Sequence, residues 1–222
     1  MTTPAEAFQR DVARLVLDVA CEHGFALAGG HALAAHDVIH RPTEDVDLFT
    51  ATDGAVRRAA VAVEAALTDA GYTVEPVDDV DDLSDLIDGF AADIAEYEVS
   101  CGENMMRLQL ARFDRRHEPV MMAIGPVLHL DDVLATKVAA LATRAEPRDY
   151  IDVAAALDTR TREQLLELAA AADPAIGPDE YADAMVRLDR LADVVFRDVY
   201  RLDQVQIDAL RARFADWPRP ER

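Results

Sequence analysis

Cysteine, lysine and long apolar runs are scarce in this chain of 222 residues, and each scarcity excludes a class of protein. The two cysteines, Cys21 and Cys101, are too few for a disulfide framework or a cysteine-based zinc site, and we interpret both as reduced, packed thiols. No apolar run reaches the roughly 18 residues that a transmembrane helix needs, and the charged N-terminal segment is unlike a signal peptide. We therefore expect a cytoplasmic protein with no membrane partner.

Positive charge is also in short supply, which is unusual for an enzyme that acts on nucleic acid. The net charge is −21, whereas phosphate backbones usually bind to basic surfaces. Residues 1–130 contain 24 acids and nine bases, and residues 131–222 contain 19 acids and 13 bases, so the C-terminal part is less repulsive to RNA. An acidic block at residues 78–85 contributes much of the N-terminal excess. We interpret this block as a solvated loop, with a docking site for a basic partner as the alternative.

Hydrophobic residues make up 51% of the chain, which is enough for a globular core. Their spacing alternates between helical and strand periods up to about residue 130 and is helical after it. The expected helices are 4–23, 31–37, 55–70, 131–144, 148–157, 162–171, 178–199 and 202–214, and the expected strands are 25–28, 45–49, 72–77, 95–100, 105–113 and 120–124. The pair Gly125-Pro126 and the turn before Asp131-Asp132 are expected to mark the boundary between the two parts. The predicted fold class is α+β: a mixed sheet with flanking helices, followed by a C-terminal helical bundle.

The most informative stretch runs from Gly29 to Phe49. On its predicted strand, Asp45 and Asp47 point to the same face with Cα atoms about 6.5–7 Å apart. Two such carboxylates repel each other unless a cation lies between them, and Mg²⁺ or Mn²⁺ suits their hard oxygen ligands. The Gly29-Gly30 turn before a short helix provides backbone N–H groups that attract phosphate. The stretch therefore predicts a triphosphate cradle beside a metal site, and the alternative is an edge strand with two ordinary surface acids.

This stretch is similar to the first motif of nucleotidyltransferases with the polymerase-β-like fold. The resemblance rests on Gly29-Gly30 and on the run Arg41-x-Thr43-x-Asp45-x-Asp47-Leu48-Phe49. With a second motif between Lys137 and Asp152, the chain resembles more narrowly the AbiEii/AbiGii-type toxins of bacterial toxin–antitoxin and abortive-infection systems. The resemblance implies a nucleotidyltransferase α/β core at 1–130 and a helical domain at 131–222 that completes the active site.

Lys137 is the one lysine of the chain, against 21 arginines. It lies on or beside the predicted buried stripe of Leu134, Val138 and Leu141. A partly buried ammonium is costly unless it meets an anion, and a lysine offers a compact charge for phosphate. The residues therefore favour a phosphate ligand, with a lysine that extends to solvent from a helix edge as the alternative.

The order Lys137-x6-Arg144-x3-Arg148-Asp149-x2-Asp152 is similar to the second motif of the AbiEii-type toxins. The resemblance implies that Lys137 contacts the triphosphate and that Asp152 is the third catalytic acid, with Asp149 as the competing choice. Arg144 and Arg148 are expected to contact phosphate. The alternative for Arg148 and Asp152 is a simple ion pair along one helix face.

Two other observations narrow the search for the site. The predicted strand 105–113 lies where the polymerase-β-like fold often carries a third carboxylate, but it contains no acid. The spacing of His31, His36 and His40 does not place three imidazoles on one helix face, so we do not expect zinc.

The resemblance implies a metal-dependent nucleotidyltransferase toxin that transfers a nucleoside monophosphate from a nucleoside triphosphate to the 3′ end of tRNA and blocks translation. A cognate antitoxin is the expected protein partner. The expected catalytic residues are Asp45, Asp47, Lys137 and Asp152, the first two of which hold the metal, and the expected nucleotide-binding residues are Gly29, Gly30, Thr43, Lys137, Arg144 and Arg148. The alternatives are transfer to a hydroxyl of a protein or of an aminoglycoside-like small molecule, and a non-catalytic nucleotide-binding module.

Overall fold

The structure of the chain is a computed structural model that describes residues 4–77 and 93–219. These residues divide into two compact units. One unit comprises Met1–Ala35 and Pro42–His129 and contains the sheet, and the other comprises His36–Arg41 and Leu130–Arg222 and is helical. The acidic block at 78–85, with its alternative interpretation as a docking site, lies outside the described residues.

The first unit is built on a mixed sheet with the strand order β3-β4-β5-β2-β1-β7-β6. Strand β2 runs parallel to β5, β1 runs parallel to β7, and the other neighbours are antiparallel. The strands are β1 (Ala26–Leu27), β2 (Asp45–Thr50), β3 (Thr73–Pro76), β4 (Ile94–Cys101), β5 (Asn104–Arg112), β6 (Val120–Met122) and β7 (Gly125–Val127).

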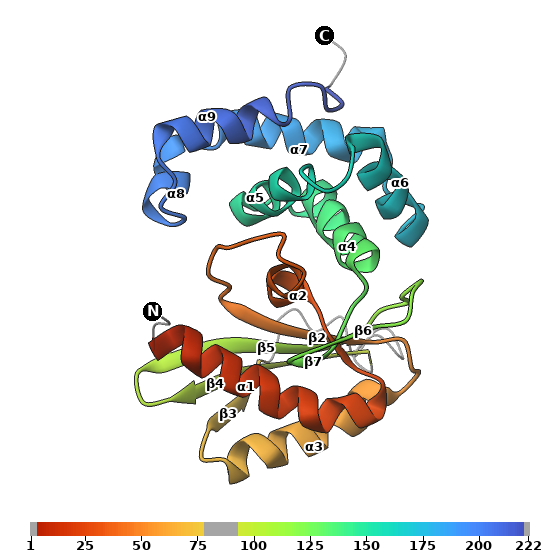
Figure 1. Cartoon of the computed structure of the whole chain (residues 1–222), viewed down its shortest axis with the longest axis vertical. Coiled ribbons are helices and arrows are strands. Elements are labelled where there is room, and N and C mark those ends of the chain that lie inside the picture. The colour runs from red at the N-terminus through yellow and green to blue at the C-terminus, as the bar shows by residue number, and fades with distance from the viewer. Residues whose placement is uncertain (1–3, 78–92, 220–222) are drawn as a thin grey trace. The chain divides into compact units, whose positions relative to one another are not determined.

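Helices cover the apolar face of this sheet. Helix α1 (Pro4–Ala20) continues into a 3₁₀ turn, η1 (Cys21–His23), and packs against α3 (Ala55–Asp69) and against several strands (Figure 1). Their amphipathic patterns bury Val12 and Leu17 of α1 and Leu67 of α3 almost completely. The short helix α2 (Gly29–Ala35) lies beside β2. The half-exposed side chains of β2 are therefore not part of the packed core.

The second unit consists of helices packed around α4, which contacts α5, α6 and α7 (Figure 1). Its helices are α4 (Leu130–Thr143), α5 (Pro147–Ala156), α6 (Arg162–Ala172), α7 (Pro178–Arg190), α8 (Asp193–Asp198) and α9 (Gln204–Ala212). The core includes Tyr150, whose hydroxyl donates to the Ala184 carbonyl at 2.6 Å. Burial raises the pKa of Tyr150 to about 12. Phe214 packs edge-on against both Tyr150 and Trp217, so aromatic side chains join the last residues to α5.

Several sequence-based expectations about local structure were wrong. The expected helix 178–199 is two helices, because Leu191 has an extended backbone and Arg211 donates to the carbonyls of Leu188 and Leu191, each at 2.7 Å. The pair Gly125-Pro126 is part of β7 and pairs with β6, while the two units divide between His129 and Leu130, just before Asp131.

Two further expectations also need correction. Helix α2 begins at Gly29, not at His31, so the glycine pair forms its first turn. Cys21 and Cys101 are exposed free thiols and do not pack in the core.

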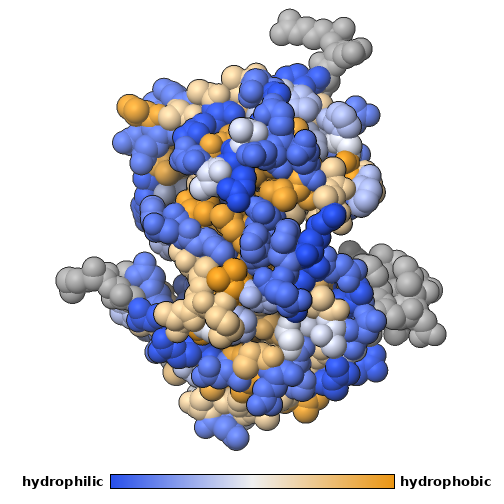
Figure 2. Space-filling model, turned by 45° about the vertical axis from the view of Figure 1, so that its right-hand side comes forward, coloured by the Kyte–Doolittle hydropathy of each residue, from blue (hydrophilic) through white to orange (hydrophobic). Residues whose placement is uncertain are grey.

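Hydrophilic side chains cover most of the face drawn in Figure 2, as expected for an acidic chain, and apolar side chains form small groups among them. Among residues 4–77 and 93–219, no helix combines the length and apolar character needed to cross a membrane.

Candidate active site

The first group of candidate residues lies where α2 meets β2. Along β2 the side chains alternate, so that Asp45 and Asp47 are half-exposed on one face while Val46 and Leu48 are buried on the other. The predicted pairing of the two carboxylates on one face therefore holds in the structure. The backbone N–H of Ala28 donates to the Asp47 carbonyl at 2.8 Å, which fixes the start of α2 against this strand.

Gly29 must be a glycine because it presses against Asp47. Its φ is +58°, in the left-handed region, and a Cβ at this position would lie 1.7 Å from Oδ2 of Asp47. No side chain fits at that distance. Gly30 follows it, buried in the first turn of the same helix. Gly29 thus allows the backbone to approach one of the two candidate metal ligands.

Thr43 connects the segment before β2 to helix α2. Its side chain is buried, with 8% exposed, and its hydroxyl lies 2.6 Å from Nε2 of His31. This contact holds the segment that leads into Asp45 close to the glycine turn. That Thr43 binds nucleotide remains a prediction.

The neighbouring strand β5 has no acid beside the two aspartates, as its sequence indicates. In the parallel register, Arg107 lies next to Asp45 and Gln109 lies next to Asp47. Gln109 in turn donates from Nε2 to Oε1 of Glu96 on β4 at 2.5 Å. A row of polar side chains therefore crosses β2, β5 and β4 on the half-exposed face.

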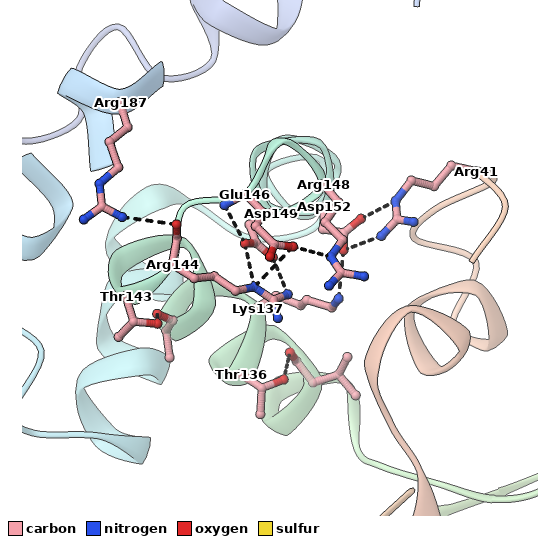
Figure 3. A network of polar contacts seen from close by, with 12 residues as sticks. Arg41, Thr136, Lys137, Thr143, Arg144, Glu146, Arg148, Asp149, Asp152 and Arg187 are labelled. Atoms are coloured by element: carbon pink, nitrogen blue, oxygen red, sulfur yellow. Dashed lines mark hydrogen bonds and ion pairs between the residues drawn. The ribbon is translucent and has the colours of Figure 1, made fainter. Parts of the chain in front are cut away.

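The second group of candidate residues surrounds Asp152 in the helical unit (Figure 3). The Asp152 side chain is 0% exposed. Arg41 donates to it twice, from Nε to Oδ1 and from Nη2 to Oδ2, each at 2.8 Å. Nζ of Lys137 lies 2.9 Å from the same Oδ2. Arg41 comes from the segment His36–Arg41, so residues far apart in the sequence meet at one carboxylate.

The electrostatics of this second group favour an ionised Asp152. Burial alone would raise the pKa of Asp152, but hydrogen bonds and charges from Arg41 and Lys137 outweigh it and hold the pKa below its ordinary value. Arg41 and Lys137 therefore both contact one buried anion.

Lys137 lies where its spacing predicted, on the buried side of α4, with 8% of the residue exposed. The anion that it contacts within the chain is the carboxylate of Asp152, on α5. An ammonium has three N–H donors, of which this contact uses one.

Asp149, the other candidate third acid, has different partners. It is fully buried and accepts from Nε and Nη2 of Arg144 at 3.0 and 2.8 Å. It also accepts from the backbone N–H of Glu146 at 3.0 Å, which completes a capping box at the start of α5. These hydrogen bonds raise the pKa of Arg144. Asp149 thus stabilises the start of a helix, while Asp152 holds Lys137.

The structure also places the two arginines that were expected to contact phosphate. Nε and Nη2 of Arg144 are used by Asp149, and 44% of its side chain is exposed. Nε of Arg148 donates to Oε2 of Glu146 at 2.8 Å. Their roles as phosphate ligands remain predictions, as does the choice between Asp149 and Asp152.

Sequence reasoning overlooked Arg41 as a partner of the second group. It appeared only as a member of the first motif, four residues before Asp45. No local signal could have paired it with Asp152, which is 111 residues away in the chain. Arg41 also lines a hollow of about 390 Å³ between residues 37–41 and the end of α5.

Known proteins resemble this chain in family and in fold. Residues 10–217 match the family described as nucleotidyl transferase AbiEii toxin, type IV TA system. No curated protein matches the chain in sequence. The crystal structure of JHP933 from Helicobacter pylori has a TM-score of 0.59 and 16% identity, covering 96% of this chain and 91% of that one. MenT4, a nucleotidyltransferase toxin of Mycobacterium tuberculosis H37Rv, has a TM-score of 0.58 and 16% identity, covering 94% and 82%. At this identity both likenesses show a shared fold, and the α+β prediction is confirmed.

Proposed function

The chain belongs to the AbiEii family of nucleotidyltransferase toxins of type IV toxin–antitoxin systems, and from this membership we propose that it transfers a nucleoside monophosphate to the 3′ end of tRNA. A nucleoside triphosphate is the substrate of such an enzyme, and an antitoxin is the partner of such a toxin. The tRNA acceptor, the metal and the role of each residue are proposals.

One observation carries the proposal: Asp45 and Asp47 lie side by side on β2, with Gly29 against Asp47. Two carboxylates on one half-exposed face fit Mg²⁺ or Mn²⁺ as a donor set, because both ions take hard oxygen ligands and keep positions for phosphate oxygens. Such an ion, when bound, supplies positive charge that offsets the triphosphate oxygens at the reacting phosphorus.

Lys137 is the proposed ligand of the triphosphate in the helical unit. Asp152 fixes its ammonium, and Arg41 balances Asp152, so the positive charge is held in place before the substrate binds. In the reaction, the acceptor hydroxyl oxygen forms a bond to the α-phosphorus, the bond from that phosphorus to the bridging oxygen breaks, and pyrophosphate leaves. The hydroxyl proton passes to a base. Positive charge from Lys137 stabilises the pyrophosphate that forms.

The contacts of Asp152 bear on its proposed role as the third acid. Both of its oxygens accept hydrogen bonds from cations, and its pKa is lowered, so it is a weak base. These contacts favour a contribution through the position of Lys137 over direct proton abstraction. Arg144 is the second proposed phosphate ligand: its contacts with Asp149 use Nε and Nη2, and 44% of its side chain is exposed.

The acidic composition keeps a second acceptor class in consideration. With a net charge of −21, the protein repels RNA phosphate but attracts a cationic substrate. Transfer to a hydroxyl of a protein or of an aminoglycoside-like molecule would use the same donor chemistry. A non-catalytic nucleotide-binding module would show a rise in melting temperature with metal and nucleotide but no transfer.

The test is an incubation of the pure protein with total tRNA, Mg²⁺ and each labelled nucleoside triphosphate in turn, with Asp45→Ala as the control. Label on tRNA that disappears with Asp45→Ala would support the proposal and identify the base. Label on tRNA that persists with a folded Asp45→Ala protein would contradict the role of the β2 carboxylates. Labelled protein or small molecules, with unlabelled tRNA, would replace the proposed acceptor.

A further inference from the structure

We propose that Gln109 supplies a neutral oxygen ligand, directly or through one water, to the divalent metal held by Asp45 and Asp47, and that Glu96 positions its amide. This inference rests on the proposed function, because it concerns the same metal. It gives β5, which contains no acid, a role in metal binding.

The sheet register places Gln109 in the right row. Gln109 is the in-register neighbour of Asp47 across the parallel β2–β5 pair, and of Glu96 across the antiparallel β4–β5 pair. Neighbouring residues in register project to the same face, from strands about 4.8 Å apart. The side chains of Asp47, Gln109 and Glu96 are half-exposed. Tyr97, which follows Glu96 in β4, and Leu108, which precedes Gln109 in β5, are buried. The Gln109 side chain therefore lies between the carboxylates of Asp47 and Glu96.

The hydrogen bond to Glu96 determines which way the amide faces. An ionised carboxylate can only accept, so it selects the NH₂ end of Gln109, and Nε2 donates to Oε1 of Glu96 at 2.5 Å. The reversed amide would set an oxygen against an oxygen. Because β4 and β2 flank β5 on opposite sides, the selected orientation leaves the carbonyl oxygen on the side of Asp47. A negative group on β4 thus directs a neutral oxygen toward the metal site.

The chemical consequence is a set of ligands without excess charge. Two carboxylates and one amide oxygen balance a divalent cation, whereas a third carboxylate would leave the set with one negative charge. A site that is neutral once the cation is bound attracts free metal less strongly than a site with three carboxylates, but it does not repel the triphosphate. We therefore expect metal affinity in the absence of nucleotide to be modest and to depend on the amide orientation.

The experiment measures Mn²⁺ binding to the full-length protein without nucleotide, from the electron paramagnetic resonance signal of free Mn²⁺. Gln109→Ala is expected to weaken binding about tenfold, because an oxygen ligand is lost. Glu96→Gln is expected to weaken it severalfold, because the amide can then reverse. The matched control is Glu98→Gln, which removes the same charge from the same face of β4, in register with Arg107. We expect this control to change Mn²⁺ affinity by less than about twofold.

Two further variants separate a ligand role from a purely structural one. Gln109→Glu should lower the melting temperature without metal, since two like charges then meet across the strands, and should bind Mn²⁺ more tightly than the wild type. The double variant Glu96→Gln/Gln109→Ala should bind Mn²⁺ as Gln109→Ala does, because Glu96 acts only through the amide. A pair that merely joined β4 to β5 would change melting temperatures and leave Mn²⁺ affinity unaltered.

The outcomes distinguish this inference from the function on which it rests. If Asp45→Ala loses Mn²⁺ binding while Gln109→Ala binds like the wild type, the inference is overturned and the metal site stands. If Glu96→Gln matches its Glu98→Gln control, the positioning role of Glu96 is overturned. If Asp45→Ala binds Mn²⁺ like the wild type, the proposed metal site itself is wrong.

Discussion

The aspartate pair of the sheet and that of the helical unit differ in burial and in their partners. On β2, Asp45 and Asp47 lie side by side and half-exposed, two like charges on one face. In α5, Asp149 and Asp152 are fully buried, and each accepts charged hydrogen bonds from arginine. The buried pair is therefore held by ion pairs within the helical unit, whereas the half-exposed pair on β2 is the one that we propose to bind a metal. Motif spacing alone does not distinguish these two uses of a carboxylate.

The largest expected effect separates the two pairs by stability. Asp152→Asn leaves the Arg41 and Lys137 cations without their buried anion, and we expect it to lower the free energy of unfolding by about 3–5 kcal/mol. Urea unfolding checks this. The control is Asp158→Asn, which breaks an exposed pair with Arg213 and should cost less than about 1 kcal/mol. Equal losses for the two variants would show that burial does not set the contrast.

The reverse contrast should appear in activity. We expect Asp45→Asn to reduce nucleotide transfer at least about a hundredfold, or roughly 2.7 kcal/mol, because the proposed metal site loses a ligand. Its free energy of unfolding should change by less than about 1 kcal/mol, because Asp45 is half-exposed and lies outside the packed core. Initial rates and urea unfolding on the same preparation test both halves. A variant that is active and destabilised would reverse the assignment of this pair.

A third variant tests whether the buried group serves both fold and function. Lys137→Met removes the ammonium but leaves the two hydrogen bonds from Arg41 to Asp152. We expect kcat/KM for the nucleoside triphosphate to fall about ten- to a hundredfold, while the fold persists because one cation still balances the anion. Steady-state kinetics with circular dichroism measure this. Unchanged kinetics in the folded variant would leave Lys137 a structural residue.

The smallest expected effect is a pH dependence confined to the helical unit. The folded pKa of Asp152 lies below its unfolded value of about 3.9, so its stabilisation is complete above that value and is lost as pH falls through the folded pKa. We expect the free energy of unfolding to decrease below about pH 4 in the wild type and to decrease less in Asp152→Asn. Urea titrations at several pH values compare the two slopes, and identical slopes would contradict the assignment.

Local sequence patterns predicted the placement of several candidate residues correctly. Alternation on β2 predicted that Asp45 and Asp47 share one face, as they do in the structure. Helical spacing also predicted the burial of Lys137. These features depend on neighbours within a few residues, which is the range over which strand and helix periods apply.

Partners across the chain were beyond such reasoning. Nothing near Arg41 indicates Asp152, because tertiary packing alone brings them together. The end of α7 depended likewise on Arg211, which supplies donors to carbonyls about 20 residues earlier in the chain. The parallel pairing of β7 with β1 also joins segments with no shared local signal. Periods identify elements, but a carboxylate's partner follows from three-dimensional packing.

Residues His36–Arg41 belong to the helical unit although they lie early in the sequence, and this affects the order in which the unit forms during translation. Arg41 is synthesised 111 residues before Asp152, a delay of roughly 6–22 seconds at ribosomal rates of about 5–20 residues per second. During this interval the nascent sheet unit carries a loop whose arginine has yet to meet that carboxylate. A chain released before α5 is complete lacks the anion that holds Lys137. The contacts that Arg41 and Lys137 make with Asp152 can therefore form only after α5 has been synthesised.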